Sequence, residues 1–499
     1  MKKKIKKFLS ILAVFSMLVP TLVYAAPEKP PGEGGQAPGG MPGSSSTSSS
    51  ASYSGATTIS SNTSESNKTY SSTTGSQNAL LVSGGTSTLS NISVNKTGDS
   101  SGDDADFYGT NAAILAYNNA VLTLKGGNIT TSASHANAVF SYGTGKITLS
   151  NTTINTTGNN SGGVMVTGGG TLTANSCTVN TKGNSSAAIR SDRGGGTLTV
   201  NKGTYKTSGQ GSPAIYSTAN ITVNNATLTS TSSEGVVVEG ANSVTLNNVK
   251  LTDTNNTLNG NSETYKNIFL YQSMSGDADS GTASFTSKNS NIITNKGDTI
   301  FVTNTTATIN LENNTITNND GDFLRIQTGK WGNSGSNGGN VTLNMTNQKV
   351  EGNVIVDNIS TLDVNMQNKS VLIGAINSSN TAKSLNVKLS KDSVISLTGD
   401  TYLTSLDNED TSNSNIYLNG YSLYVNGKKV SANNGTYSGD SKKAKSQDIE
   451  IVEENNNYIY YIAGAVVFVG VITTIVIVCN KKRKKRLSNQ DEIKDVSND

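Results

Sequence analysis

Cysteine, histidine and tryptophan are almost missing from this chain of 499 residues. The two cysteines, Cys177 and Cys479, lie in the repeated part and near the C-terminus, too far apart to pair, so we expect no disulfide bond. The single histidine, His135, argues against a histidine-ligated metal site or a histidine-based catalytic triad. We therefore predict neither a metal site nor a cofactor.

Proline is also scarce, and its placement is informative. Six of the seven prolines lie at or before Pro42, which leaves only Pro213 in the rest of the chain. A strand that is paired on both sides needs every backbone N–H group, which proline lacks. The chain after Pro42 can therefore form continuously paired strands.

The charge is low and unevenly placed. The formal net charge is +3, but basic residues concentrate at the two ends, and the part between carries 26 basic against 31 acidic residues. This central part of the chain is therefore mildly acidic, which disfavours binding to nucleic acid.

A repeated pattern organises the chain from Asn111 to about Asp253. Each copy has an apolar residue, a threonine and an apolar residue, with a further apolar residue five positions later. The copies are Leu122-Thr123-Leu124 with Ile129, Ile147-Thr148-Leu149 with Ile154, Leu172-Thr173-Ala174 with Val179, Leu198-Thr199-Val200 with Tyr205, Ile221-Thr222-Val223 with Leu228, and Val244-Thr245-Leu246 with Leu251. Repeats with periods of about 20 to 50 residues indicate a stacked array.

A second feature keeps step with the first, because each copy also has a small residue followed by an aliphatic one. The pairs are Ala113-Ile114, Ala138-Val139, Gly163-Val164, Ala188-Ile189, Ala214-Ile215 and Gly235-Val236. The apolar runs are short, alternate with period two and are separated by Gly, Asn and Ser, which predicts strands and tight turns. We therefore predict an all-β fold, a single-stranded parallel β-helix solenoid with about three strands per coil.

The segments outside the repeats have distinct compositions. Residues 1–26 have a lysine-rich start, an apolar run and a small-residue exit, the pattern of a secretory signal peptide. Residues 27–55 are rich in Pro, Gly and Ser and are expected to form a disordered linker. The solenoid is expected over residues 56–426 and a polar stalk over residues 427–457.

The C-terminal region predicts a membrane anchor. Residues 458–479 are apolar and uncharged, and a basic cytoplasmic tail follows over residues 480–499. We expect a single-pass protein of the cell membrane with an extracellular N-terminal part, from a bacterium with a Gram-positive-like envelope.

The repeat is looser after Asp253, and insertions interrupt it. Later coils are predicted at Ile309-Asn310-Leu311, Val341-Thr342-Leu343, Leu362-Asp363-Val364, Leu385-Asn386-Val387 and Ile416-Tyr417-Leu418. Insertions are predicted between Gly98 and Gly109, around Asp277 and around Gly332.

These repeats resemble the right-handed parallel β-helix proteins of the pectin-lyase-like superfamily, which includes pectin-degrading enzymes and many adhesins. The resemblance covers the solenoid, and the tail and the Ser/Thr/Asn/Gly-rich repeats are most similar to adhesin-like surface proteins. It implies a right-handed solenoid but does not choose between catalysis and adhesion.

Sugar-cleaving β-helix enzymes need paired carboxylates or a cationic base with a calcium site. Acidic residues cluster in turns and insertions, and we expect these to be solvated charges and assign no catalytic residue. The clusters contain Asp103, Asp104 and Asp106, then Asp277 and Asp279, then Asp320 and Asp322, while Arg190 and Arg193 flank Asp192.

The residues one and three places after the repeated aliphatic residue are predicted to point outward. These two columns are unusually rich in aromatic residues, which favours a contact surface. An inserted loop over this face, or a different phase of the strand, would remove that surface. The candidate ligand-binding residues are Tyr117, Phe140, Tyr142, Arg190, Asp192, Arg193, Tyr216 and Glu239.

Two further columns are expected on the surface. The threonines of the triplets form one, which the β-propensity of threonine explains. Asn175, Asn201, Asn224 and Asn247 form the other, which predicts an asparagine ladder that supports a turn.

The sequence thus predicts a cell-surface protein that acts as an adhesin or recognition stalk. Its partner would be a host or environmental glycan or a surface protein. Two alternatives stay open, a membrane-tethered polysaccharide lyase or glycoside hydrolase, and a purely structural spacer.

Overall fold

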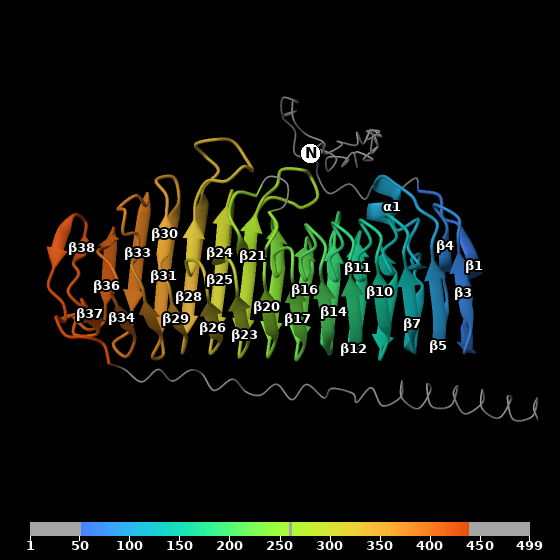
Figure 1. Ribbon diagram of the computed structural model, residues 1–499, viewed down its shortest axis with the longest axis horizontal. Coiled ribbons are helices and arrows are strands. Elements are labelled where there is room, and N and C mark those ends of the chain that lie inside the picture. The colour runs from blue at the N-terminus through green and yellow to red at the C-terminus, as the bar shows by residue number, and fades with distance from the viewer. Residues whose placement is uncertain (1–50, 259–261, 439–499) are drawn as a thin grey trace, which may run out of the picture. The chain divides into compact units, whose positions relative to one another are not determined.

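The computed structural model describes residues 51–258 and 262–438, which form a parallel β-solenoid (Figure 1). It winds in the right-handed sense for about 15 turns, which confirms the predicted solenoid. The predicted signal peptide, membrane span 458–479 and tail 480–499 lie outside the described residues, as do most of the linker and the later part of the stalk. Among the described residues, no helix has the length and apolarity needed to cross a bilayer.

Sheet A is formed by the first strand of each of the first twelve coils. Each strand pairs in parallel with the matching strand of the next coil, so chain order is also spatial order. The strands are β1 (Gly55–Ile59), β4 (Asn78–Val82), β6 (Ile114–Ala116), β8 (Val139–Tyr142), β11 (Val164–Thr167), β13 (Ile189–Ser191), β15 (Ile215–Ser217), β18 (Val236–Glu239), β21 (Lys266–Tyr271), β24 (Asp298–Thr303), β27 (Leu324–Ile326) and β30 (Val354–Val356).

Sheet B has twenty strands and forms the other long wall of the solenoid. In some coils the second and third predicted strands are one bent strand. Its strands are β2 (Thr63–Ser66), β3 (Thr69–Ser72), β5 (Thr86–Lys96), β7 (Val121–Thr131), β9 (Lys146–Ser150), β10 (Thr153–Thr156), β12 (Gly170–Thr181), β14 (Gly196–Thr207), β16 (Asn220–Asn224), β17 (Thr227–Ser230), β19 (Ser243–Asn247), β20 (Lys250–Asp253), β22 (Thr282–Lys288), β23 (Asn291–Thr294), β25 (Thr305–Glu312), β26 (Thr315–Asn318), β28 (Gly339–Thr346), β31 (Thr361–Gln367), β33 (Ser384–Leu389) and β36 (Ser405–Asn408).

Two small sheets complete the C-terminal coils. Sheet C contains β29 (Lys349–Glu351), β32 (Val371–Ile373), β34 (Val394–Ser396) and β37 (Ile416–Tyr417). Sheet D contains β35 (Thr401–Leu403), β38 (Leu423–Val425) and β39 (Lys428–Val430). β39 runs antiparallel to β38, so the last described strand ends the parallel stacking.

The predicted columns are confirmed residue by residue. Ile114, Val139, Val164, Ile189, Ile215 and Val236 are register partners in sheet A and belong to the central apolar core. In sheet B, a second column starts at Leu122, and each member pairs with the next one along the stack. The later members are Ile147, Leu172, Leu198, Ile221 and Val244. Each buried side chain therefore stacks on a similar one from the next coil, about 4.8 Å away.

The register predicted for the later coils differs from the register in the structure. Ile309-Asn310-Leu311 is in line with the earlier triplets, because Thr245 pairs with Thr286 and Thr286 with Asn310. The next predicted triplet, Val341-Thr342-Leu343, is shifted by two residues against this register, because Ile309 pairs with Leu343 and not with Val341. A shift of two residues leaves the same side chains facing inward, so the apolar pattern alone cannot reveal it.

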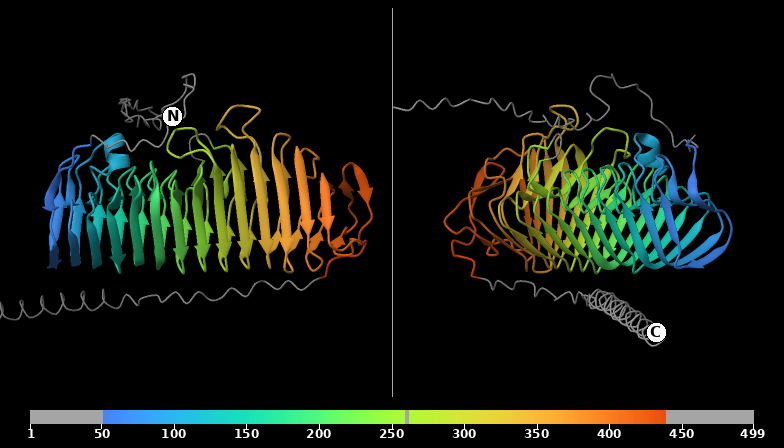
Figure 2. Two further views of the ribbon diagram at one scale, coloured as in Figure 1. Left: turned by 180° about the vertical axis from the view of Figure 1, so that it is seen from behind. Right: turned by 45° about the vertical axis from the view of Figure 1, so that its right-hand side comes forward.

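Three segments project from one long edge of the solenoid (Figures 1 and 2). The first contains α1 (Asp103–Tyr108), a six-residue helix within the insertion that was predicted between Gly98 and Gly109. The other two are the loops between β21 and β22 and between β27 and β28, which contain Asp277 and Gly332. All three predicted insertions are therefore present.

Candidate functional site on the outer face of sheet A

The outer face of sheet A carries an apolar cluster that α1 and its neighbours cover. Leu81, Leu115, Phe140 and Met165 stack along successive strands, and Ala112 of the insertion packs with them. Phe140 is 0 % exposed. The column points away from the solenoid core, as predicted, but it is not an open contact patch. The prediction of an open patch at Phe140 was wrong, because the first insertion folds back over this residue.

Half-buried tyrosines surround this cluster. Tyr53 lies with its ring centroid 4.3 Å from that of Tyr117 and 6.4 Å from that of Tyr142. Tyr108, at the end of α1, meets Tyr142 edge to face at 5.6 Å. Tyr117 and Tyr142 of the predicted set are thus brought together. Tyr53 and Tyr108 join them from segments that the repeat pattern does not include.

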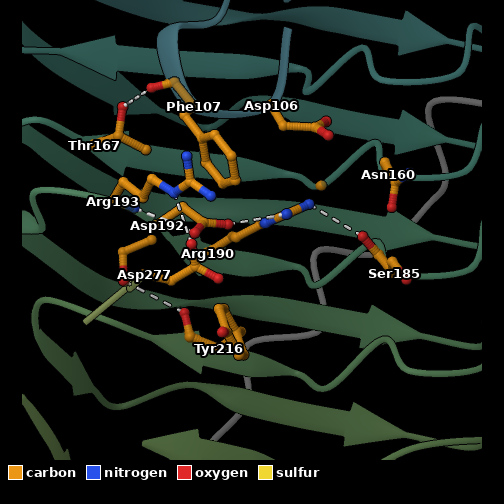
Figure 3. Close-up of polar contacts among 12 residues, drawn as sticks. Asp106, Phe107, Asn160, Thr167, Ser185, Arg190, Asp192, Arg193, Tyr216 and Asp277 are labelled. Atoms are coloured by element: carbon orange, nitrogen blue, oxygen red, sulfur yellow. Dashed lines mark hydrogen bonds and ion pairs between the residues drawn. The ribbon is translucent and has the colours of Figure 1, made fainter. Parts of the chain in front are cut away.

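The charged candidates form a second group, further along the same face (Figure 3). Arg190 Nη2 lies 3.0 Å from Asp192 Oδ2, and the two side chains are only 12 % and 5 % exposed. Arg190 Nη1 also donates to the carbonyl oxygen of Ser185 at 3.1 Å. This ion pair is held within the wall of the solenoid, not presented to solvent.

Arg193 links two insertions to the solenoid. Its Nε lies 2.7 Å from Asp277 Oδ1 in the β21–β22 loop, and its Nη1 lies 3.0 Å from Asp103 Oδ2 in α1. Its guanidinium also lies over the ring of Phe107, 3.9 Å from the centroid. Thr167 Oγ1 donates to the carbonyl oxygen of Phe107 at 2.6 Å, so α1 has a further attachment to sheet A.

Tyr216 and Glu239 meet in the next coils. Tyr216 OH donates to Glu239 Oε2 at 2.5 Å, and Tyr271 OH donates to the same oxygen at 2.9 Å. The hydroxyl of Ser273 donates to Glu239 Oε1. Glu239 is 1 % exposed, so these donors replace the water that a buried carboxylate loses.

Asp192 is a carboxyl group of this face whose pKa is raised. Burial raises the pKa of Asp192 to about 6, and the charges of Asp277 and Glu239 add to the rise, while Arg190 opposes it. A carboxyl group with such a pKa could serve as a general acid. However, Arg190 and the backbone N–H of Arg193 already bind its two oxygens. These two donors hold the carboxyl group of Asp192 in a fixed position.

The acidic insertions are less solvated than expected. Asp103 and Asp277 pair with Arg193, and Asp106 Oδ1 lies 2.8 Å from His135 Nδ1. Further along, Asp322 Oδ2 lies 2.5 Å from Arg325 Nη2. The expectation of solvated charges was wrong for Asp106, Asp277 and Asp322, whose side chains are 18 %, 21 % and 19 % exposed. It was right for Asp103, which stays 69 % exposed although it pairs with Arg193.

A second aromatic cluster lies further along the outer face of sheet A. Val237, Phe269, Tyr271 and Phe301 are buried there, and the only tryptophan, Trp331, packs on them from the β27–β28 loop. Trp331 lies 5.4 Å from Phe269 between ring centroids. The repeat pattern could not identify Trp331, because this residue lies in an insertion. The only sequence signal was a single tryptophan among polar residues.

In the part of the chain that the structure describes, no group of three or more His, Cys, Asp or Glu side chains could hold a metal ion. Cys177 is a free, buried thiol, and burial raises its pKa.

Comparisons with known protein families, curated proteins and solved structures gave no match. Membership of the pectin-lyase-like superfamily therefore stays a prediction.

Proposed function

We propose that this chain is a surface-anchored recognition stalk, an adhesin whose solenoid contacts glycans or a neighbouring cell. The observation that carries the proposal is the use of the charged groups on the outer face of sheet A. Arg193 joins Asp277 and Asp103 of two insertions, and the Arg190–Asp192 pair beside it is nearly buried, so these groups are not arranged around an open catalytic centre.

The anchoring part of the proposal comes from the ends of the sequence. The signal-peptide pattern of residues 1–26 supports export, and the apolar segment 458–479 with the basic run after it supports a stop-transfer anchor. A stack of coils between these segments is suited to holding a contact surface away from a membrane, because each coil adds about 4.8 Å to its length.

The contact surface in this proposal is the tyrosine cluster of Tyr53, Tyr108, Tyr117 and Tyr142. Aromatic rings that are half buried combine apolar area with a polar hydroxyl group, which suits recognition surfaces. Tyr216, Glu239, Arg190, Asp192 and Arg193 take part in internal contacts, and in this proposal they support the surface. Binding by Phe140 would require the first insertion to move away.

Attachment of the full-length chain to polysaccharide-coated beads and to whole cells tests the proposal. Replacement of Tyr117 and Tyr142 by Ser should reduce attachment at least tenfold without a change in the β-sheet circular dichroism signal. Tyr424→Ser is the matched control, since Tyr424 is half buried and stacked on Tyr402 at 4.8 Å in the last coils. If the wild-type chain attaches to none of these surfaces, the spacer alternative holds instead.

A further inference from the structure

A hollow lies on another part of the wall, away from the tyrosine cluster. It has a volume of about 580 Å³. Its lining comes from three successive coils and includes Tyr265, Asp298, Asp320, Asp322 and Arg325. The volume of the hollow is within the range of small-molecule sites, but its lining is mostly polar, which favours a polar ligand.

Internal hydrogen bonds hold the lining rigidly. Arg325 Nε lies 2.6 Å from Asp298 Oδ2, and the second carboxylate on Arg325 is Asp322. The backbone N–H of Asp322 donates to Asp298 Oδ1 at 2.9 Å. Asn318 Oδ1 accepts from the backbone N–H groups of Asp320 and Gly321, so the turn that carries these aspartates is fixed before any ligand arrives.

The floor of the hollow is formed by backbone from stacked turns. A side chain at Gly297, where φ is +81°, would place its Cβ 2.1 Å from the carbonyl oxygen of Tyr265. A side chain at Gly321 would place its Cβ 2.3 Å from the carbonyl oxygen of Gly297. Glycine is therefore required at both positions for the coils to stack, and the same requirement leaves the floor bare.

The charge of the hollow selects the kind of ligand. Its lining holds four acidic side chains, of Glu263, Asp298, Asp320 and Asp322, against the single arginine Arg325. Lys296 lies over the ring of Tyr265 and Lys330 pairs with Glu263, so the surroundings stay net negative even with both included. Arg325 is already bound by two carboxylates and offers little to an anion. A ligand that donates hydrogen bonds or carries positive charge complements this lining.

We propose that the hollow is a subsite for a sugar ring that bears a free amino group, and that it excludes uronic acids. The proposal rests on the proposed function, because it names the glycan class and places a second contact on the same stalk. Asp320 is the main contact for the amino group. It is exposed, and the one hydrogen bond that its carboxylate accepts among the described contacts, from the N–H of Gly297 at 3.3 Å, uses only Oδ2.

Three hexasaccharides with different charges test this proposal by calorimetry on the full-length chain at low salt. These are the hexamers of glucosamine, N-acetylglucosamine and galacturonic acid, and binding should weaken in that order. Asp320→Asn should weaken binding of the glucosamine hexamer two- to fivefold, the range of an exposed ion pair, and leave the N-acetylglucosamine hexamer unchanged. The difference should shrink at high salt.

Asp104→Asn is the matched control, because Asp104 is an exposed aspartate of α1 and its loss changes the net charge equally. Glu263→Gln serves as a second variant within the hollow. Equal binding of the galacturonic acid hexamer, or wild-type binding of the glucosamine hexamer by Asp320→Asn, would overturn the proposal. A wild-type chain that attaches to cells but binds none of the three hexamers would overturn the subsite and leave the recognition stalk standing.

Discussion

At the scale of single residues, the wall of the solenoid contains a nearly buried ion pair, although ion pairs are usually exposed to solvent. Arg190 and Asp192 are nearly buried, and a buried ion pair loses hydration that its Coulomb attraction only partly restores. The raised pKa of Asp192 expresses this cost. Such a pair adds little net stability, but it specifies where its neighbours must lie.

The stability of the protein should therefore depend on pH through Asp192. An acid whose pKa is raised on folding binds its proton more tightly in the folded state, so the free energy of unfolding falls as pH rises through the interval between the two pKa values. With a folded pKa of about 6, this fall occurs between about pH 4 and pH 6 and amounts to at most about 3 kcal/mol.

Denaturant unfolding of the wild type and of Asp192→Asn at several pH values measures this contribution. The fall between about pH 4 and pH 6 should be smaller in Asp192→Asn than in the wild type, while Asp104→Asn should retain it in full. The raised pKa values of Asp253 and Asp298 add the same contribution to all three proteins. Parallel curves for the wild type and Asp192→Asn would show that Asp192 keeps an ordinary pKa in the folded chain.

The repeated residues were predictable because each is specified by position in its own coil. The asparagine ladder shows this well. Asn201 Nδ2 donates to Asn175 Oδ1 at 3.0 Å, and Asn224 Nδ2 donates to Asn201 Oδ1 at 2.9 Å. The residue after each asparagine turns the chain with positive φ, at Ser176, Lys202 and Asn225. The predicted support of a turn is confirmed.

At the scale of elements, the three insertions determine which part of sheet A reaches solvent. The repeats could not predict this, because α1 and the two loops carry no period. The partners of Arg193 are Asp103 and Asp277, which lie far from it in sequence on either side. Tyr53 likewise precedes the first predicted coil. Long-range contacts between segments without a repeat leave no pattern that one sequence reveals.

Arg193 should control the mobility of two of these elements. Arg193→Ala removes the ion pairs to Asp103 and Asp277 and the contact with Phe107. Amide hydrogen exchange should increase about tenfold or more in residues 98–109 and 272–281, while the strands of sheet B stay protected. Lys182→Ala, an exposed residue directly after β12, is the control. Unchanged exchange in both segments would mean that the apolar contacts alone hold them.

At the scale of the whole described unit, length depends on the number of coils and not on the number of residues. Thr88, Thr222, Thr245 and Thr286 lie in one outward column of sheet B. The coil from Thr245 to Thr286 includes an insertion, yet it should advance the stack by the same ~4.8 Å as the shorter coil from Thr222 to Thr245.

Spin-label distances test this relation directly. With Cys177 and Cys479 replaced by Ala and Ser, labels at Thr88 and at Thr222, Thr245 or Thr286 should give distances that rise by about 5 Å at each step. A larger rise at the last step would mean that the extra residues of this coil, between β20 and β21 or between β21 and β22, interrupt the stacking.

The central claim is that this solenoid serves contact and not catalysis, and product analysis tests it most directly. The full-length chain is incubated with the glycans to which it attaches, and with pectic polymers, in the presence and absence of Ca²⁺. New reducing ends and unsaturated products are then measured over time. The account predicts attachment with no product above that of a heat-denatured control. Product that accumulates with enzyme concentration would contradict it and establish a polysaccharide lyase or hydrolase.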